Sequence, residues 1–120
     1  MIEIIATDYP GLVAVKVSDK LTKEEFLQVK AELEKNINQH GKFRFLVEAS
    51  GLKIPEAGFF AEDFKFVIHN HQYAEKVALV GDKVWEKIWM EFIKLITSVN
   101  ARFFDSGEQK EAWEWIKTND

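Results

Sequence analysis

The chain has 120 residues, of which 47% are hydrophobic, 30% are charged and 13% are aromatic. We therefore expect one globular domain, residues 1–120, that buries about two-thirds of the surface of its unfolded form. Cysteine is absent, which excludes disulfides, thiolate metal ligands and a thiol nucleophile. The net charge of −4 disfavours nucleic-acid binding, which needs a basic surface. No signal-peptide pattern and no apolar run of about 20 residues is present, so we expect a cytoplasmic protein.

The first half of the chain predicts a hairpin, a helix and a central strand. Residues 2–5 are rich in isoleucine, an Asp-Tyr-Pro-Gly turn follows, and residues 12–17 alternate as in a half-buried strand. The helix predicted over 22–40 opens with a Thr-Lys-Glu-Glu capping box and is followed by glycine. Residues 43–48 are nearly all apolar except Arg44, which is typical of a strand covered on both faces.

The second half alternates helices and strands. A proline suited to a first helical turn opens a helix predicted over 55–69, and a short buried strand follows at 77–80. A third helix is predicted over 83–97, a last strand over 101–104, and a final helix after Ser106.

The resulting order is β-β-α-β-α-β-α-β-α. Strands that alternate with helices indicate right-handed crossovers and parallel pairing. The expected fold class is therefore α/β, with a single mixed, mostly parallel five-stranded sheet, four helices, and the first strand antiparallel at one edge.

Several short segments share their order and spacing with a known domain family. They are Leu21-Thr22, the stretch 40–44, the stretch 80–83 with Trp85, and Phe104-Asp105 followed by Glu111-Ala112-Trp113. Together they resemble the SpoIIAA-like branch of the STAS domains over essentially the whole chain. The resemblance implies a STAS-type fold and a binding module without catalysis.

The chain departs from the family pattern at the start of its second helix. Bacterial anti-sigma antagonists of the STAS type carry Asp-Ser-Ser-Gly there, with one serine phosphorylated, whereas residues 55–58 read Pro-Glu-Ala-Gly. We therefore expect no phosphoswitch and interpret Ser50, the nearest serine, as a structural turn residue. The branch without that serine is similar in fold to lipid-binding domains of the CRAL-TRIO type. That similarity implies apolar ligand binding and membrane association.

Few polar residues suggest chemistry. Glu48, Asp82 and Asp105 end predicted parallel strands, at the rim where open α/β sheets bind ligands, and three carboxylates could hold Mg²⁺. However, Asp82 and Asp105 directly precede helices, which favours helix capping. His69 and His71 lack further ligands at a metal-binding spacing and are interpreted as capping the second helix. We predict no enzyme, no catalytic residue, no metal site and no cofactor. A small metal-assisted enzyme at the acidic rim is the third hypothesis.

The second and third helices carry more apolar residues than packing on a sheet requires. In the second helix, with about 100° per residue, one side is predicted to face the sheet: Ala57, Phe60, Ala61, Phe64, Val67 and Ile68. Phe59 and Phe66 are predicted to lie on the opposite side. In the third helix, about half the circumference is apolar: Val84, Trp85, Ile88, Trp89, Phe92, Ile93, Leu95 and Ile96. Its other side carries a basic ridge of Lys83, Lys87 and Lys94.

Two explanations of this surplus stay open: the helices pack on each other as a closed core, or they form a pocket or an exposed patch. We favour a non-catalytic module that binds an apolar or amphipathic, lipid-like ligand or a membrane surface through these helices, so the protein would be cytoplasmic and peripheral to the membrane. The ligand-binding residues are predicted to be Phe59, Phe66, Trp85, Trp89, Phe92 and Ile93. The alternative is a protein-interaction or homo-oligomerisation domain that uses the same surface.

Overall fold

The computed structural model describes residues 1–119, which form five strands and four α-helices. The strands are β1 (Ile2–Ile5), β2 (Leu12–Val17), β3 (Phe43–Glu48), β4 (Ala74–Gly81) and β5 (Ala101–Asp105). The helices are α1 (Lys23–His40), α2 (Ala57–Asn70), α3 (Val84–Thr97) and α4 (Gln109–Ile116). Short 3₁₀ turns precede β4 and α4: η1 (His71–Tyr73) and η2 (Ser106–Glu108).

The predicted topology is confirmed. The strands form one sheet in the order β1-β2-β3-β4-β5, in which β1 runs antiparallel to β2 and every other neighbouring pair is parallel. Two boundaries differ from the prediction by more than one residue. Strand β4 begins at Ala74, three residues before position 77, and α2 begins at Ala57 because Glu56 keeps an extended backbone.

Local sequence signals fix the ends of α1 as predicted. The Thr22 hydroxyl accepts a hydrogen bond from the Glu25 amide at 3.1 Å, and the Glu25 carboxylate accepts one from the Thr22 amide at 3.1 Å. At the other end Gly41 takes a left-handed φ of 76° and donates its amide to Ile37. The left-handed conformation favours glycine at this position.

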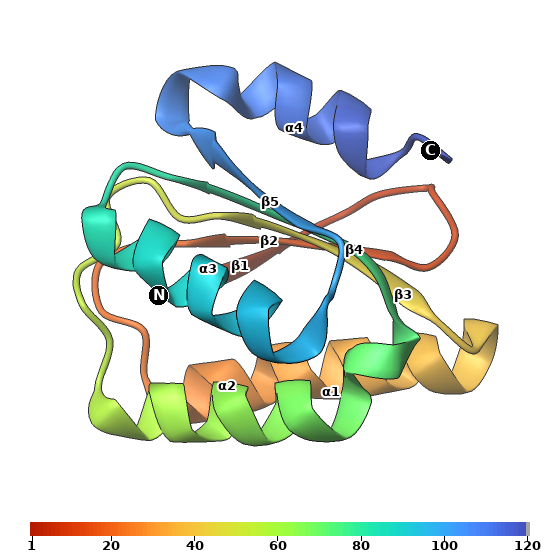
Figure 1. The fold of residues 1–120 in the computed structure, drawn as a ribbon, viewed down its shortest axis with the longest axis horizontal. Coiled ribbons are helices and arrows are strands. Elements are labelled where there is room, and N and C mark those ends of the chain that lie inside the picture. The colour runs from red at the N-terminus through yellow and green to blue at the C-terminus, as the bar shows by residue number, and fades with distance from the viewer. Residues whose placement is uncertain (120) are drawn as a thin grey trace.

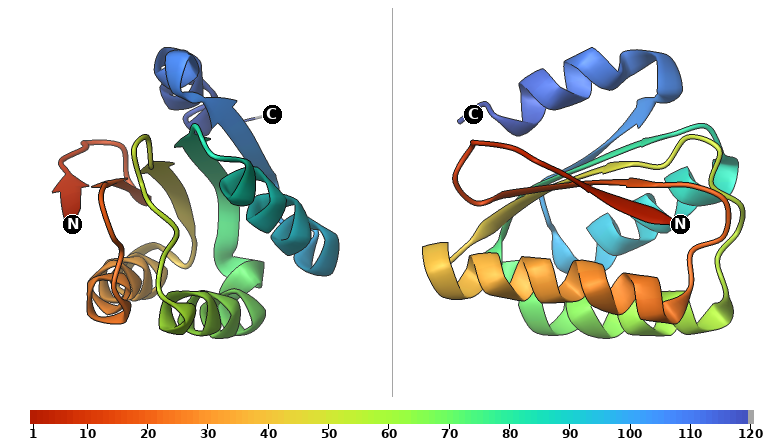
Figure 2. Two further views of the ribbon diagram at one scale, coloured as in Figure 1. Left: turned by 90° about the vertical axis from the view of Figure 1, so that its left-hand side faces the viewer. Right: turned by 180° about the vertical axis from the view of Figure 1, so that it is seen from behind.

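The sheet has a three-helix face and a one-helix face. Figures 1 and 2 show α1, α2 and α3 on one side of the sheet and α4 alone on the other. Alternation along β3 sends Phe43, Phe45 and Val47 toward the three helices, whereas Leu46 belongs to the core beneath α4. This division places the two hydrophobic cores of the domain on opposite sides of one sheet.

Two buried cations hold the C-terminal end of α4 on the sheet. Arg44 donates through Nη1 to the carbonyls of Ile116 and Thr118 at 2.8 and 2.7 Å, and Lys76 donates to the carbonyl of Trp115 at 2.9 Å. The last carbonyls of a helix lack intrahelical donors and carry partial negative charge, so cations suit them. This contact explains the single basic residue within the otherwise apolar pattern of β3.

We expect Arg44→Ala to lower the free energy of unfolding by about 2–4 kcal/mol, because buried carbonyls lose their donors. Urea denaturation would measure the loss. Lys42→Ala is the matched control, since Lys42 contacts the same Glu75 carboxylate from an exposed position. The control should change stability by less than about 1 kcal/mol. Equal losses in both variants would contradict the capping role.

Candidate functional site

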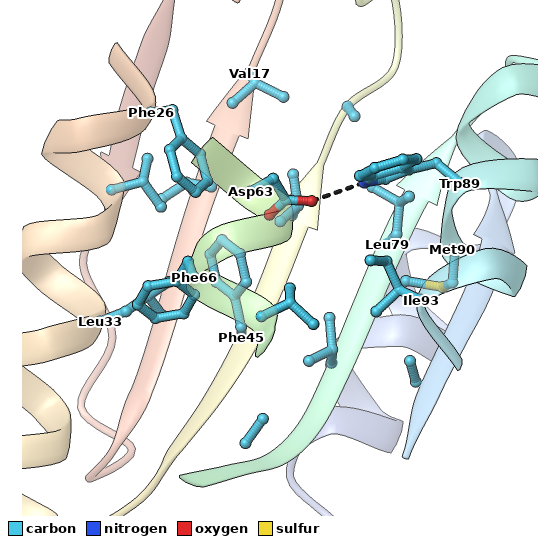
Figure 3. Close-up of a pocket in the computed structure, with 18 of the residues that line it drawn as sticks. Val17, Phe26, Leu33, Phe45, Asp63, Phe66, Leu79, Trp89, Met90 and Ile93 are labelled. Carbon is cyan, nitrogen blue, oxygen red and sulfur yellow. Dashed lines mark hydrogen bonds between the residues drawn. The ribbon is translucent and has the colours of Figure 1, made fainter. Parts of the chain in front are cut away.

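An apolar cavity of about 170 Å³ lies between the three-helix face of the sheet and helices α1, α2 and α3. Figure 3 shows side chains converging on it from all three helices and from the strands beneath. Its lining includes Phe26 and Leu33 from α1, Phe66 from α2, and Phe45 and Leu79 from the sheet. An engineered apolar cavity of about 150 Å³ binds benzene, so this space is large enough for a small organic molecule.

Helix α2 presents the opposite side to that predicted. Phe66 is 6% exposed and its ring centroid lies 6.2 Å from that of Phe43 on β3, while the Phe59 ring lies 5.4 Å from Phe26 on α1. The predicted sheet-facing residues Phe64 and Ile68 are exposed instead. The prediction was therefore wrong about which side faces the sheet, although Val67, which was predicted to face it, does line the cavity.

The physical reason for this error is a carboxylate on the inward face. Asp63 lies four residues after Phe59 and three before Phe66, so one side of the helix carries all three side chains. An acidic residue on that side made it resemble the solvent-facing side. Phe60, which was also predicted to face the sheet, turns to α3, where its ring centroid lies 4.9 Å from Trp89 and 5.8 Å from Trp85.

Helix α3 supplies the other wall of the cavity. Trp85, Trp89 and Ile93 line it, whereas Phe92 is 41% exposed and stacks on Phe64 at 6.3 Å outside it. Five of the six predicted ligand-binding residues thus surround one cavity, and Phe92 lies on the outer surface. That these residues bind a ligand stays a prediction.

The structure combines the two explanations given for the apolar surplus. A row of aromatic rings, Phe60 and Phe64 from α2 with Trp85, Trp89 and Phe92 from α3, joins the two helices. We call this row the aromatic seam. The helices therefore do pack on each other through the seam, while the cavity remains between them and the sheet.

Two carboxyl groups line this otherwise apolar space. Asp63 accepts a hydrogen bond on Oδ2 from the Trp89 indole at 2.7 Å, as Figure 3 shows. Burial raises the pKa of Asp63 to about 6, although the Trp89 bond acts in the opposite direction. Because a carboxylate loses hydration inside a protein, its ionised form is costly there.

Glu86 is the second carboxyl group, with 1% of its surface exposed. Its Oε1 accepts the amides of Asp82 and Lys83 at 3.1 and 2.9 Å, whereas its Oε2 is buried and has no hydrogen-bond partner within residues 1–119. Burial raises the pKa of Glu86. Gly81 makes room for this carboxylate, since a Cβ there would lie 2.4 Å from Oε1.

Sequence reasoning missed both acids as site residues. For Asp63 a signal was present, because an acid three and four residues from aromatic side chains shares their side of a helix. For Glu86 the signal was its place at the third position of a helix that opens after Gly81-Asp82, where a glutamate can reach back to free amides. Neither signal shows by itself that the carboxyl group borders a cavity.

Two carboxylates of the acidic rim contact protein groups. Glu48 accepts the Trp113 indole at 2.8 Å, and Asp82 contacts the Lys83 side chain and the Gly51 amide. Within residues 1–119, no group of three or more His, Asp and Glu side chains could hold a metal ion.

The helix-cap predictions had mixed outcomes. Asp82 was predicted to cap α3, but Lys83 holds the N-cap position and the Glu86 carboxylate accepts the free amides. That prediction was wrong because the Glu86 side chain, one turn into the helix, accepts the amides of Asp82 and Lys83 instead. Within the described residues, Asp105 holds the N-cap position of η2 without a capping hydrogen bond from its side chain, and its amide donates to the Glu108 carboxylate at 2.8 Å.

The remaining polar candidates have structural contacts. Ser50 and Ser106 share a hydrogen bond of 2.8 Å between their hydroxyls, which joins the loops after β3 and β5. His69 contacts the carbonyl of Lys65 in the last turn of α2, and His71 takes the C-cap position and lines the cavity. No helix within the described part of the chain is long and apolar enough to cross a bilayer.

The raised pKa of Asp63 predicts a pH-dependent stability. The group has a pKa of about 6 in the folded protein and an ordinary value of 3.8. Between these two pH values the folded protein therefore binds more protons than the unfolded chain does. Its contribution to stability is therefore full below about pH 4 and is lost as the pH rises through about 6. We expect Asp63→Asn, which keeps an oxygen for Trp89, to be more stable than the wild type by about 3 kcal/mol at pH 7.5 and nearly as stable as the wild type near pH 4.

Urea denaturation at the two pH values would test this. Glu91→Gln, an exposed change on α3, is the control and should leave the pH dependence as it is in the wild type. An Asp63→Asn variant with the wild-type pH dependence would show that this carboxyl is not buried in its ionised form.

Comparisons with known proteins agree with this fold. The SpoIIAA-like family model matches residues 12–117. A solved structure from Shewanella loihica PV-4, described as an uncharacterized protein from the DUF3478 family with a SpoIIAA-like fold, superposes with a TM-score of 0.75. It is 19% identical in sequence and the alignment covers 97% of this chain and 92% of that one. A search of curated proteins found no match. The extent of the family match shows that the chain belongs to the SpoIIAA-like family.

Proposed function

We propose that this domain binds a small apolar or amphipathic molecule in the cavity between the sheet and helices α1, α2 and α3. The observation that carries the proposal is the cavity itself, about 170 Å³ of space bordered almost entirely by apolar side chains. The SpoIIAA-like fold suggests a non-catalytic module, and an apolar cavity with few polar groups is typical of a ligand site.

The energetics of an empty cavity support the same proposal. Unfilled apolar space destabilises a protein by about 24 cal/mol per Å³, which gives about 4 kcal/mol for a cavity of 170 Å³. A ligand that fills the space would recover part of this free energy through contacts with the lining. The volume suits one ring or a short chain.

The four tryptophans provide an internal test of binding. Trp85 and Trp89 line the cavity, whereas Trp113 and Trp115 pack in the core beneath α4. We expect toluene and 1-hexanol to shift the indole N–H signals of Trp85 and Trp89 in ¹⁵N NMR spectra and to leave the other two unchanged. No shift at saturating probe, or equal shifts in all four signals, would contradict the proposal.

A variant in which a larger side chain fills the cavity tests the same proposal. Val67→Phe adds volume at a position that lines the cavity and should abolish the shifts, while Ile68→Phe, on the exposed side of α2, should preserve them. Unchanged Trp113 and Trp115 signals would verify that both variants are folded.

A second function is favoured by the outer side of α3. We propose that this side contacts a lipid surface. Large apolar side chains are exposed there, with Leu95 83% exposed, and two from α2 extend the surface. This exposed stripe consists of Val84, Ile88, Phe92, Leu95 and Ile96 with Phe64 and Ile68. Lys87 and Lys94 flank it, and apolar stripes of this kind bordered by lysines are typical of helices that lie in a membrane interface.

Flotation with vesicles of phosphatidylcholine and phosphatidylserine would test this contact. We expect the double variant Ile88→Gln with Leu95→Gln to lose vesicle binding while its free energy of unfolding changes by less than about 1 kcal/mol, since both side chains are exposed. Leu27→Gln, an exposed position on α1, is the control and should bind vesicles as the wild type does. A wild-type dimer that the double variant converts to a monomer in sedimentation, without vesicle binding, would assign the stripe to homo-oligomerisation instead.

A further inference from the structure

We infer that the ligand of the cavity carries a cationic amine, which the carboxylates of Asp63 and Glu86 recognise. This inference rests on the proposed function, because it names the chemical class of the molecule that would fill the cavity. It follows from the charges that border the space and from the hydrogen bonds that they lack.

The charged groups that border the cavity are acidic. Asp63 comes from α2 and Glu86 from α3, and no lysine or arginine is among the lining residues. The other polar lining side chains are Asn70 and His71, which lie at the end of α2. In an apolar environment the field of two carboxylates is weakly screened, so it favours a cation and opposes an anion.

Both carboxylates have unused hydrogen-bonding capacity. Within residues 1–119, the Asp63 carboxylate accepts one hydrogen bond, from the Trp89 indole. Glu86 Oε2 is fully buried without a partner, although a carboxylate can accept about four hydrogen bonds. Because unsatisfied buried charges are costly, native structures normally pair them. The contrast with Arg44, which donates to four acceptors, shows that this fold satisfies buried charges elsewhere.

An ammonium group matches these two acids. It brings a positive charge and three donors, and charge-assisted hydrogen bonds are stronger than neutral ones. A hydroxyl brings one donor and no charge, and a carboxylate brings a third negative charge. Charge and the number of donors therefore rank head groups on the same apolar chain as amine first, alcohol second and carboxylate last.

Three six-carbon probes test the ranking at pH 7.5 by calorimetry: hexylamine, 1-hexanol and hexanoate. We expect hexylamine to bind at least tenfold more tightly than 1-hexanol, and hexanoate to bind at least tenfold more weakly. Asp63→Asn and, separately, Glu86→Gln should each reduce the preference for hexylamine over 1-hexanol at least threefold. Glu91→Gln, on the outer side of α3, is the matched control and should keep the full preference.

The outcomes separate this inference from the proposed function. If 1-hexanol binds as tightly as hexylamine, or if the preference survives in both variants, the amine inference is overturned while the cavity remains a ligand site. If none of the three probes binds and toluene shifts no indole signal, both are overturned. Using two single variants keeps the test valid if one of them fails to fold.

Discussion

The hydrogen bond from Trp89 to Asp63 is the contact on which the arrangement above the sheet depends. It joins α2 to α3 across 26 positions of sequence and brings an acidic group to the inner side of α2. Helix α2 packs beside α1 and reaches the sheet mainly through long side chains such as Phe66, so the space between them is not filled by backbone (Figure 2). The cavity lies between α2 and the sheet, with α1 and α3 at its sides.

The buried charged groups on the two faces of the sheet differ in how fully their hydrogen bonds are satisfied. Beneath α4, Arg44 and Lys76 are surrounded by carbonyl and carboxylate acceptors, so their charges serve to hold a helix end in place. On the three-helix face, Asp63 and Glu86 keep acceptor capacity that no group within residues 1–119 uses fully. Arg44 and Lys76 thus have their donors satisfied, whereas the unpaired Oε2 of Glu86 leaves hydrogen-bonding capacity in a residue that lines the cavity.

The broad apolar arc of α3 corresponds to two different surroundings of the helix. Its inner side, with Trp85, Trp89 and Ile93, borders the cavity, and its outer side, with Ile88 and Leu95, is exposed. One helix therefore connects the two proposed surfaces. The aromatic seam joins this helix to α2 between those two surfaces.

The sequence by itself determined the order of the elements, the ends of α1 and the direction of each strand, because capping residues, turns and alternation act over a few neighbouring positions. It also indicated that Phe59, Phe66, Trp85, Trp89 and Ile93 belong together. Only the tertiary structure decided which side of α2 faces inward and that Asp63 lies there. Helix α2 has apolar residues on more than one side, so its sequence does not fix its orientation. The spacing of Asp63 places it beside Phe59 and Phe66, but its bond to Trp89 joins positions that are distant in sequence, so no local pattern could show that contact.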